Sequence, residues 1–387
     1  MDLDYAPEDL AFREEVRAFI ASELPPDVRA KLGQGRALEK AEIVDWQRRL
    51  NRRGWATPSW PKEAGGPGWS PLQRQIFMDE VHQAPAPEPL SFNCTMLGPV
   101  LIAFGTDAQR ARFLQRAANL DDWWAQGFSE PEAGSDLANL KTTARREGDA
   151  YVVNGQKMWQ GMAHWADWMF TLVRTDPSAP KKQAGITFLL IDLKSPGVTV
   201  RPIITVDGRH EVNEVFLDEV RIPIDQRVGE ENDGWTVAKY LLSNERTGIA
   251  RIGMTRRLIT RVRAMANDEA AGLSETARER VLQKAAMIEA ELKALEITQL
   301  RVLSAQKPGV ADPRSSILKI KGVELRQAAS ELLLRTAGRQ AFEFAYEGEG
   351  LAPFEAASNY LTLRAASIYG GASEVQKNII ASTVLGL

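Results

Sequence analysis

The sequence predicts a mainly α-helical protein with a β domain at its centre, and three stretches of different pattern support this. Apolar residues recur at helical spacing in residues 1–120. Short runs of β-branched and aromatic residues take over in residues 121–231, and helical spacing returns in residues 232–387. A chain of 387 residues is too long for one compact core. We therefore expect three domains with these boundaries.

The first domain is predicted to consist of helices. Pro7 and Glu8 are typical of a first helical turn, and apolar side chains follow at helical spacing up to residue 23. Further helices are expected at residues 39–53, 71–84, 93–105 and 107–119. Residues 60–69 are rich in glycine and proline, which predicts a loop between two of these helices.

The middle domain is predicted to be a β module of short strands. The strands are expected at residues 151–153, 168–173, 186–191, 198–200 and 215–217. Turn-forming clusters separate them, such as Glu-Gly-Asp at residues 147–149 and Ser-Pro-Gly at residues 195–197.

The last domain is predicted to be a helical bundle. Glycine and proline become sparse inside its segments, and residues 275–305 place their apolar side chains on one stripe with charged residues beside it. A long helix with one apolar face needs other helices to cover that face.

Composition excludes several classes of function. The net charge of −3 provides no broad basic field for nucleic acid. No apolar run approaches the roughly 18 to 20 residues of a membrane span, and the acidic N-terminus is unlike a signal peptide. Cys94 is the only cysteine, so a buried thiol in a reducing cytoplasm is expected. No cluster of metal-ligating residues suggests a metal site.

Three motifs carry the chemistry. Residues 126–136 read Gln-Gly-Phe-Ser-Glu-Pro-Glu-Ala-Gly-Ser-Asp, residues 154–159 read Asn-Gly-Gln-Lys-Met-Trp, and residues 368–376 read Ile-Tyr-Gly-Gly-Ala-Ser-Glu-Val-Gln. The first motif alone is equally consistent with a β-turn whose glycine, serine and aspartate serve turn geometry. The second motif at its present distance makes that interpretation much weaker.

With these motifs the chain resembles the acyl-CoA dehydrogenases along its whole length. Trp-Pro-Lys-Glu-Ala-Gly-Gly at residues 60–66 and Val-Arg-Ile-Pro at residues 220–223 add to the likeness. Within the family, residues 121–127, 201–215 and 245–253 are most similar to pimeloyl-CoA dehydrogenase large subunits. The resemblance implies an N-terminal helical domain, a β-barrel-like middle domain and a C-terminal four-helix bundle. It also implies FAD between the last two.

The resemblance assigns roles to individual residues. Backbone and hydroxyl groups around Phe128 and Ser129 are expected to bind the edge of the flavin ring, and Trp159 to cover part of its face. The implied cofactor-binding residues are Gln126, Phe128, Ser129, Trp159, Gly161, Ala372 and Glu374. The implied substrate-binding residues are Ser135, Arg246 and Gly371.

The tail departs from the family at the catalytic base. Many members have a glutamate where Gly370 stands, whereas isovaleryl-CoA dehydrogenases place theirs immediately before an arginine, which matches Glu245 and Arg246. We expect Glu245 to take the α-proton, with a pKa raised by burial, and the Gly370 N–H to bind the thioester oxygen. The alternative for Glu245 and Arg246 is an exposed ion pair on a helix.

Other departures concern a second subunit. An Arg-x-Thr-Phe-Gly stretch that holds a neighbour's FAD is absent from residues 273–280, and Ala-Gly-Arg-Gln at residues 337–340 replaces a Gly-Gly-Asn-Gly turn. We expect a heteromer, in an α2β2 arrangement with a homologous partner, although a homo-oligomer stays open. An electron-transfer flavoprotein is the expected electron acceptor. The alternatives are an acyl-CoA oxidase and a non-catalytic acyl-CoA-binding subunit.

The resemblance also bears on the acyl group. Heteromeric relatives often act on bulky or dicarboxylic thioesters, which favours a pimeloyl-like substrate, while an aromatic ring or a steroid side chain stays open. Arg209 or His210 can meet a distal carboxylate, but a plain surface turn is the better explanation of residues 207–210.

Overall fold

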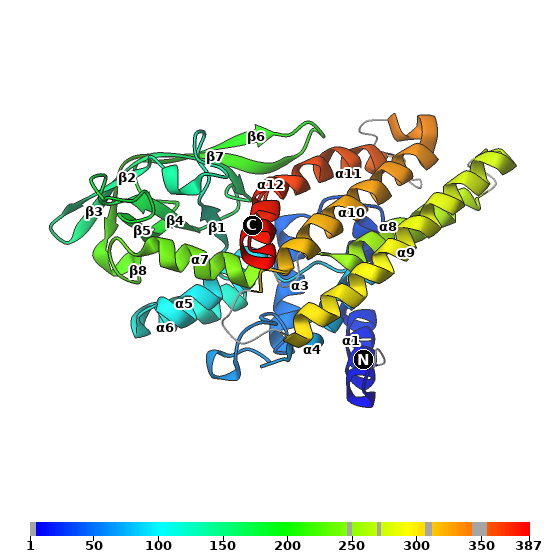
Figure 1. Ribbon diagram of the computed structural model, residues 1–387. Coiled ribbons are helices and arrows are strands. Elements are labelled where there is room, and N and C mark those ends of the chain that lie inside the picture. The colour runs from blue at the N-terminus through cyan, green and yellow to red at the C-terminus, as the bar shows by residue number, and fades with distance from the viewer. Residues whose placement is uncertain (1–4, 246–249, 269–271, 306–311, 343–353) are drawn as a thin grey trace. The chain divides into compact units, whose positions relative to one another are not determined.

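The computed structural model describes residues 5–245, 250–268, 272–305, 312–342 and 354–387. The chain forms two compact units, which are described separately (Figure 1). Unit 1 consists of Met1–Ile43, Trp69–Glu88 and Arg246–Leu387. Unit 2 consists of Val44–Gly68 and Pro89–Glu245.

Unit 2 is built on one sheet, which contains eight strands in the described part of the chain. The strands are β1 (Trp124–Gly127), β2 (Thr143–Glu147), β3 (Ala150–Gly161), β4 (Trp168–Arg174), β5 (Ile186–Asp192), β6 (Val198–Ile204), β7 (His210–Pro223) and β8 (Arg227–Val228). Their order across the sheet is β6-β7-β3-β2-β4-β5-β8, with β1 paired to β4 off this path. Most pairs are antiparallel, whereas β1 and β2 each pair with β4 in parallel.

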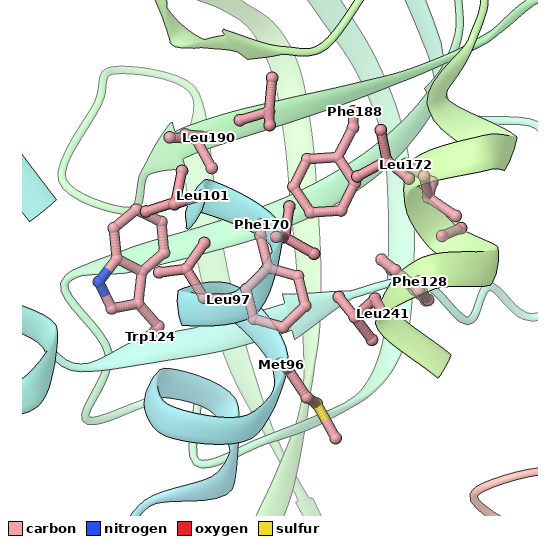
Figure 2. Close-up of a cluster of buried hydrophobic side chains, with 14 of the residues drawn as sticks. Met96, Leu97, Leu101, Trp124, Phe128, Phe170, Leu172, Phe188, Leu190 and Leu241 are labelled. Carbon is pink, nitrogen blue, oxygen red and sulfur yellow. The ribbon is translucent and has the colours of Figure 1, made fainter. Parts of the chain in front are cut away.

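Helices cover the sheet of unit 2 and share its core. They are α5 (Gly98–Phe104), α6 (Asp107–Ala118), α7 (Gly234–Glu245) and the π-helical η2 (Phe92–Leu97). Figure 2 shows Phe128, Phe170 and Phe188 from the sheet side packed with Leu97 of η2 and Leu241 of α7. All of these side chains are buried, so the start of the first motif belongs to this core.

The part of α3 (Lys40–Arg52) from Val44 onward is tied to unit 2 by a buried amide. Gln47 Nε2 donates to the carbonyl of Ala118 at 3.0 Å and to Cys94 Sγ at 3.2 Å. Cys94 is buried as predicted, and burial raises the pKa of its thiol to about 12. A thiol with such a pKa stays protonated and is an inert core residue.

Unit 1 is helical in the part that the structure describes. Its helices are α1 (Pro7–Glu23), α2 (Pro26–Gly33), α4 (Pro71–Gln83), α8 (Ile252–Ala266), α9 (Glu275–Ala305), α10 (Ser315–Ala337), α11 (Phe354–Arg364) and α12 (Ser373–Ile379). α8, α9 and α10 run beside one another (Figure 1) and enclose a core that includes Ile259, Val262 and Leu333. α4 begins with a capping box, in which Ser70 Oγ accepts from the Gln73 N–H at 3.1 Å.

The predicted order of helical, β and helical segments is confirmed. Each helix expected in the first 120 residues begins and ends within about one residue of the observed limits. The strands β1, β2 and β8 and the helix α2 were not predicted, because each is short. Among the described residues, none of the helices is both long and apolar enough to cross a membrane.

Candidate functional site

A buried ion pair joins the first two motifs. Lys157 Nζ lies 2.8 Å from Glu130 Oε1 and also donates to the carbonyls of Phe128, at 3.3 Å, and Leu172, at 2.7 Å. The Lys157 side chain is fully buried and that of Glu130 nearly so. Because one charge comes from each motif, the turn after β1 is held against the middle of β3.

The surroundings of Lys157 and Glu130 keep both side chains ionised. Burial lowers the pKa of Lys157 to about 8, against the opposing effect of Glu130. Burial alone raises the pKa of Glu130, but Lys157 and the backbone N–H groups of Thr142 and Lys141 outweigh it and lower that pKa. Both groups are therefore charged at neutral pH and satisfied by hydrogen bonds.

The first motif presents its backbone at the end of β1. Gln126 is half-buried, Gly127 and Phe128 are buried, and Ser129 is half-buried. A Cβ on Gly127 would lie 2.6 Å from Thr171 Oγ1 on β4, so only glycine lets these strands approach so closely. The carbonyl of Ser129 accepts from the Met158 N–H at 2.9 Å, which fixes the turn beside β3.

Trp159 of the second motif is exposed and has an unusual backbone conformation. It is 55% exposed and has a φ of 72° at a bulge in β3, where the pairing with β7 shifts between Met158 and Gln160. Left-handed backbone is costly for a bulky residue, by roughly 1–2 kcal/mol, and persists where neighbours enforce it. Gln160 Nε2 helps to enforce it by donating to the carbonyl of Met158 at 2.9 Å. The bulge turns the indole ring outward.

These features fit a large planar ligand. An exposed indole beside the backbone of residues 128–129 provides an aromatic face next to hydrogen-bonding groups. Gly161 lies at the end of the same strand, and a Cβ there would come 2.9 Å from Phe92 Cζ. Gly161 is thus required for packing against η2. Ser135 is exposed in the loop that follows the first motif.

The tail motif forms a tight turn in unit 1. Gly370 and Gly371 have φ values of 65° and 87°, and both conformations favour glycine. Lys319 Nζ donates to the carbonyls of Ala366 and Gly371, each at 2.9 Å, and so closes the turn from α10. A Cβ on Gly371 would lie 2.3 Å from Gln376 Nε2.

The remaining predicted residues lie around this turn or at the end of α7. Ala372 occupies the N-cap position of α12, and Glu374 is exposed in the first turn of that helix. Glu245 is the last residue of α7. The side chain of Glu245 and the whole of Arg246 lie outside the described residues.

Sequence reasoning missed a charged cluster in unit 1. Glu88 Oε1 accepts from Arg251 Nη1 at 2.7 Å and lies 3.0 Å from His82 Nε2. Burial alone raises the pKa of Glu88, but Arg251 and His82 outweigh it and lower that pKa to about 2. Arg326 on α10 is the second arginine of this cluster and an electrostatic neighbour of Glu88. No motif marks these residues, because they come from four separate places in the chain.

The side chains of the turn at residues 207–210 contact one another and nearby residues. Arg209 Nε lies 3.7 Å from Asp207 Oδ2, and Arg209 Nη1 lies 3.7 Å from Glu211 Oε1. His210 Nε2 lies 2.7 Å from Asn213 Oδ1, and its ring stacks on His164. These contacts support the interpretation of a structural turn. Among the described residues, no group of acidic, histidine or cysteine side chains is arranged to hold a metal ion.

Comparison with protein families gives three consecutive matches. Residues 6–121 match the acyl-CoA dehydrogenase N-terminal domain, residues 125–220 the acyl-CoA dehydrogenase middle domain, and residues 232–385 the acyl-CoA dehydrogenase C-terminal domain. The matches together cover most of the chain.

The chain is similar to individual relatives over almost the full length of both proteins. The chain is 36% identical to "Acyl-CoA dehydrogenase IpdE1" of Mycobacterium tuberculosis over 385 residues, which cover 97% of each protein. Among solved structures, the ChsE4-ChsE5 complex from Mycobacterium tuberculosis contains a chain with 33% identity and a TM-score of 0.86, covering 100% of this chain and 99% of that one. The structure described as "Tcur3481-Tcur3483 steroid ACAD" has 30% identity and a TM-score of 0.88, with the same coverage.

Proposed function

Because the chain belongs to the acyl-CoA dehydrogenase family, a family of FAD-dependent oxidoreductases acting on acyl-CoA, we propose that it converts an acyl-CoA thioester to a trans-2-enoyl-CoA with Glu245 as the base. The observation that carries the proposal is the pairing of the two motifs by Lys157 and Glu130. A rigid platform with an exposed indole is what a flavin-binding site requires. FAD, when bound, supplies the hydride acceptor.

Gly370 contributes to this reaction through its backbone. Its φ of 65° belongs to a turn that Lys319 holds, and in the described part of the chain its N–H has no hydrogen-bond acceptor. A free N–H in a fixed turn can donate to the thioester oxygen, on which negative charge grows as the α-proton leaves. Gly370 therefore retains the electrostatic role of the tail motif without a carboxylate.

Glu245 takes the α-proton in this proposal. Glycine at position 370 cannot act as a base, so the carboxylate must come from another segment. Glu245 belongs to α7, and burial of a carboxyl group beside the flavin and the acyl chain is expected to raise its pKa. A raised pKa suits a group that must accept a proton near neutral pH.

Replacement of Glu245 tests this role. Glu245→Gln should lower turnover about 100- to 10,000-fold and abolish the bleaching of the flavin by acyl-CoA, because general-base catalysis is worth that much. Glu331→Gln, at a partly exposed glutamate of α10 paired with Arg335, is the matched control. Flavin content and circular dichroism should equal those of wild type in both variants. Normal bleaching in Glu245→Gln would refute the assignment.

The protein is proposed to work as one subunit of a heteromer. The absence of the neighbour-facing FAD contacts at residues 273–280 and 337–340 supports this, as does the likeness to a chain of the ChsE4-ChsE5 complex. Co-expression with a homologous partner should yield one FAD per pair of unlike subunits, with electrons passing to an electron-transfer flavoprotein. Full FAD content and normal turnover of the chain alone would contradict the heteromer.

The acyl group has two candidates. A dicarboxylic acyl group follows from the likeness to pimeloyl-CoA dehydrogenases, and a bulky polycyclic group is favoured by the relative described as a steroid ACAD. A panel of both thioester types, followed with an artificial electron acceptor, separates them.

A further inference from the structure

Arg326 is a buried cation of unit 1, and the described residues supply no acceptor to its Nε. Arg326 lies in α10, and only 4% of the residue is exposed. Its Nε is inaccessible to solvent and has no acceptor among the residues that the structure describes. A guanidinium carries five N–H donors, and a buried charge without a partner is strongly unfavourable. An acceptor from outside the described chain would remove this penalty.

The neighbouring charges do not neutralise Arg326. Its electrostatic neighbours are Arg251, Tyr369 and Glu88. Glu88 already accepts from Arg251 at 2.7 Å and lies 3.0 Å from His82, so its carboxylate is engaged by one guanidinium and one imidazole. Burial, with a contribution from Arg251, lowers the pKa of Arg326 to about 10, which leaves it charged at neutral pH. The cluster therefore carries an excess positive charge.

Arg326 lies on the same helix, α10, as Lys319, which holds the tail turn. Lys319 and Arg326 are seven residues apart on α10, which is two helical turns, so both lie on one face. Lys319 holds the carbonyls of Ala366 and Gly371. Tyr369, the electrostatic neighbour of Arg326, immediately precedes Gly370. The Arg326 side chain thus starts from the face of α10 whose Lys319 binds the tail turn.

We propose that Arg326 binds a carboxylate at the far end of the substrate's acyl group, so that the substrate is an ω-carboxyacyl-CoA. The proposal rests on the proposed function for the acyl-CoA and for the thioester oxygen at Gly370. A carboxylate matches the fork of a guanidinium with two parallel hydrogen bonds.

Binding tests the proposal without turnover. The probes are the thioether analogues of pimeloyl-CoA and heptanoyl-CoA, which have equal numbers of acyl carbons and a methylene group in place of the thioester carbonyl. Calorimetry on the intact protein with its partner should show tighter binding of the carboxylated probe. Arg326→Met should weaken that probe about 10- to 100-fold, the value of a charged hydrogen bond, and change the other less than about threefold. Arg326→Lys should restore part of the affinity.

A matched control and a second measurement separate the outcomes. Arg335→Met alters an exposed arginine of the same helix and should leave both affinities unchanged. Equal losses for both probes in Arg326→Met, or no preference in wild type, would overturn the carboxylate site. Wild type that prefers the carboxylated probe through Arg326 but oxidises neither thioester would instead contradict the proposed function and leave the site standing.

Discussion

Two buried cations, Lys157 in unit 2 and Arg326 in unit 1, have opposite surroundings. Lys157 Nζ has a carboxylate at 2.8 Å and two carbonyl acceptors, whereas the described residues supply no acceptor to Arg326. Burial lowers the pKa of both, to about 8 and about 10. A satisfied buried charge is part of the architecture, while an unsatisfied one requires an explanation outside the fold. Lys157 therefore contributes to the structure of the site, whereas Arg326 is the residue that we propose binds a ligand.

Removal of Lys157 should have the largest effect. Lys157→Met leaves Glu130 buried without its counter-charge, and breaking a buried pair in this way costs about 3–5 kcal/mol. The free energy of unfolding, measured by denaturant titration, should fall by that amount. The double variant Lys157→Met with Glu130→Gln should regain part of it, because no charge is then left unpaired. A loss below about 1 kcal/mol would show that the pair does not hold the platform.

Glu88 is the compensated member of the Arg326 cluster, and its removal should have the next largest effect. Its pKa in the fold, about 2, lies below the ordinary 4.5, so it stabilises the fold above pH 4.5 and this contribution disappears as the pH falls toward 2. The difference corresponds to roughly 3 kcal/mol. Glu88→Gln should therefore be less stable than wild type at pH 7, with the two stabilities converging near pH 2. Parallel curves across this range would contradict the prediction.

Arg326→Met should leave the fold equally or more stable, in contrast to Lys157→Met. The variant removes a buried charge whose Nε has no acceptor in the described part of the chain, and Glu88 keeps Arg251 and His82. A rise of about 1 kcal/mol or no change is expected for the ligand-free protein by thermal and denaturant unfolding. A loss as large as that of Lys157→Met would mean that Arg326 is as well compensated as the lysine.

Replacement of Trp159 should also change stability only slightly. Trp159→Gly relieves the left-handed backbone at φ 72° while removing a 55% exposed ring, so the apoprotein should gain about 1 kcal/mol. Flavin affinity, measured by fluorescence titration, should fall because the aromatic face is lost. Trp55, a buried tryptophan of the same unit, is the control: Trp55→Gly should lower stability strongly. Unchanged flavin affinity in Trp159→Gly would remove Trp159 from the cofactor site.

The limits of sequence prediction follow from these residues. The helices of the first 120 residues have strong periodic patterns, and their limits were predicted closely, as were those of β4 and β5. The strands β3 and β7 extend well beyond the predicted residues 151–153 and 215–217. β8 contains only two residues and was missed, since so short a strand has no periodicity. Arg326 was missed for another reason. In a helix with charged residues at many positions, an arginine is expected to face solvent, and only packing shows that it does not.

The sequence by itself determined the domain order, the likeness to the acyl-CoA dehydrogenases and the absence of a carboxylate at Gly370, because these depend on local pattern and residue identity. Only the tertiary structure decided that Glu130 and Lys157, separated by 27 residues, form one buried pair, and that the described residues supply no acceptor to Arg326 Nε. Burial and charge compensation arise between segments that are distant along the chain, and no local pattern encodes them.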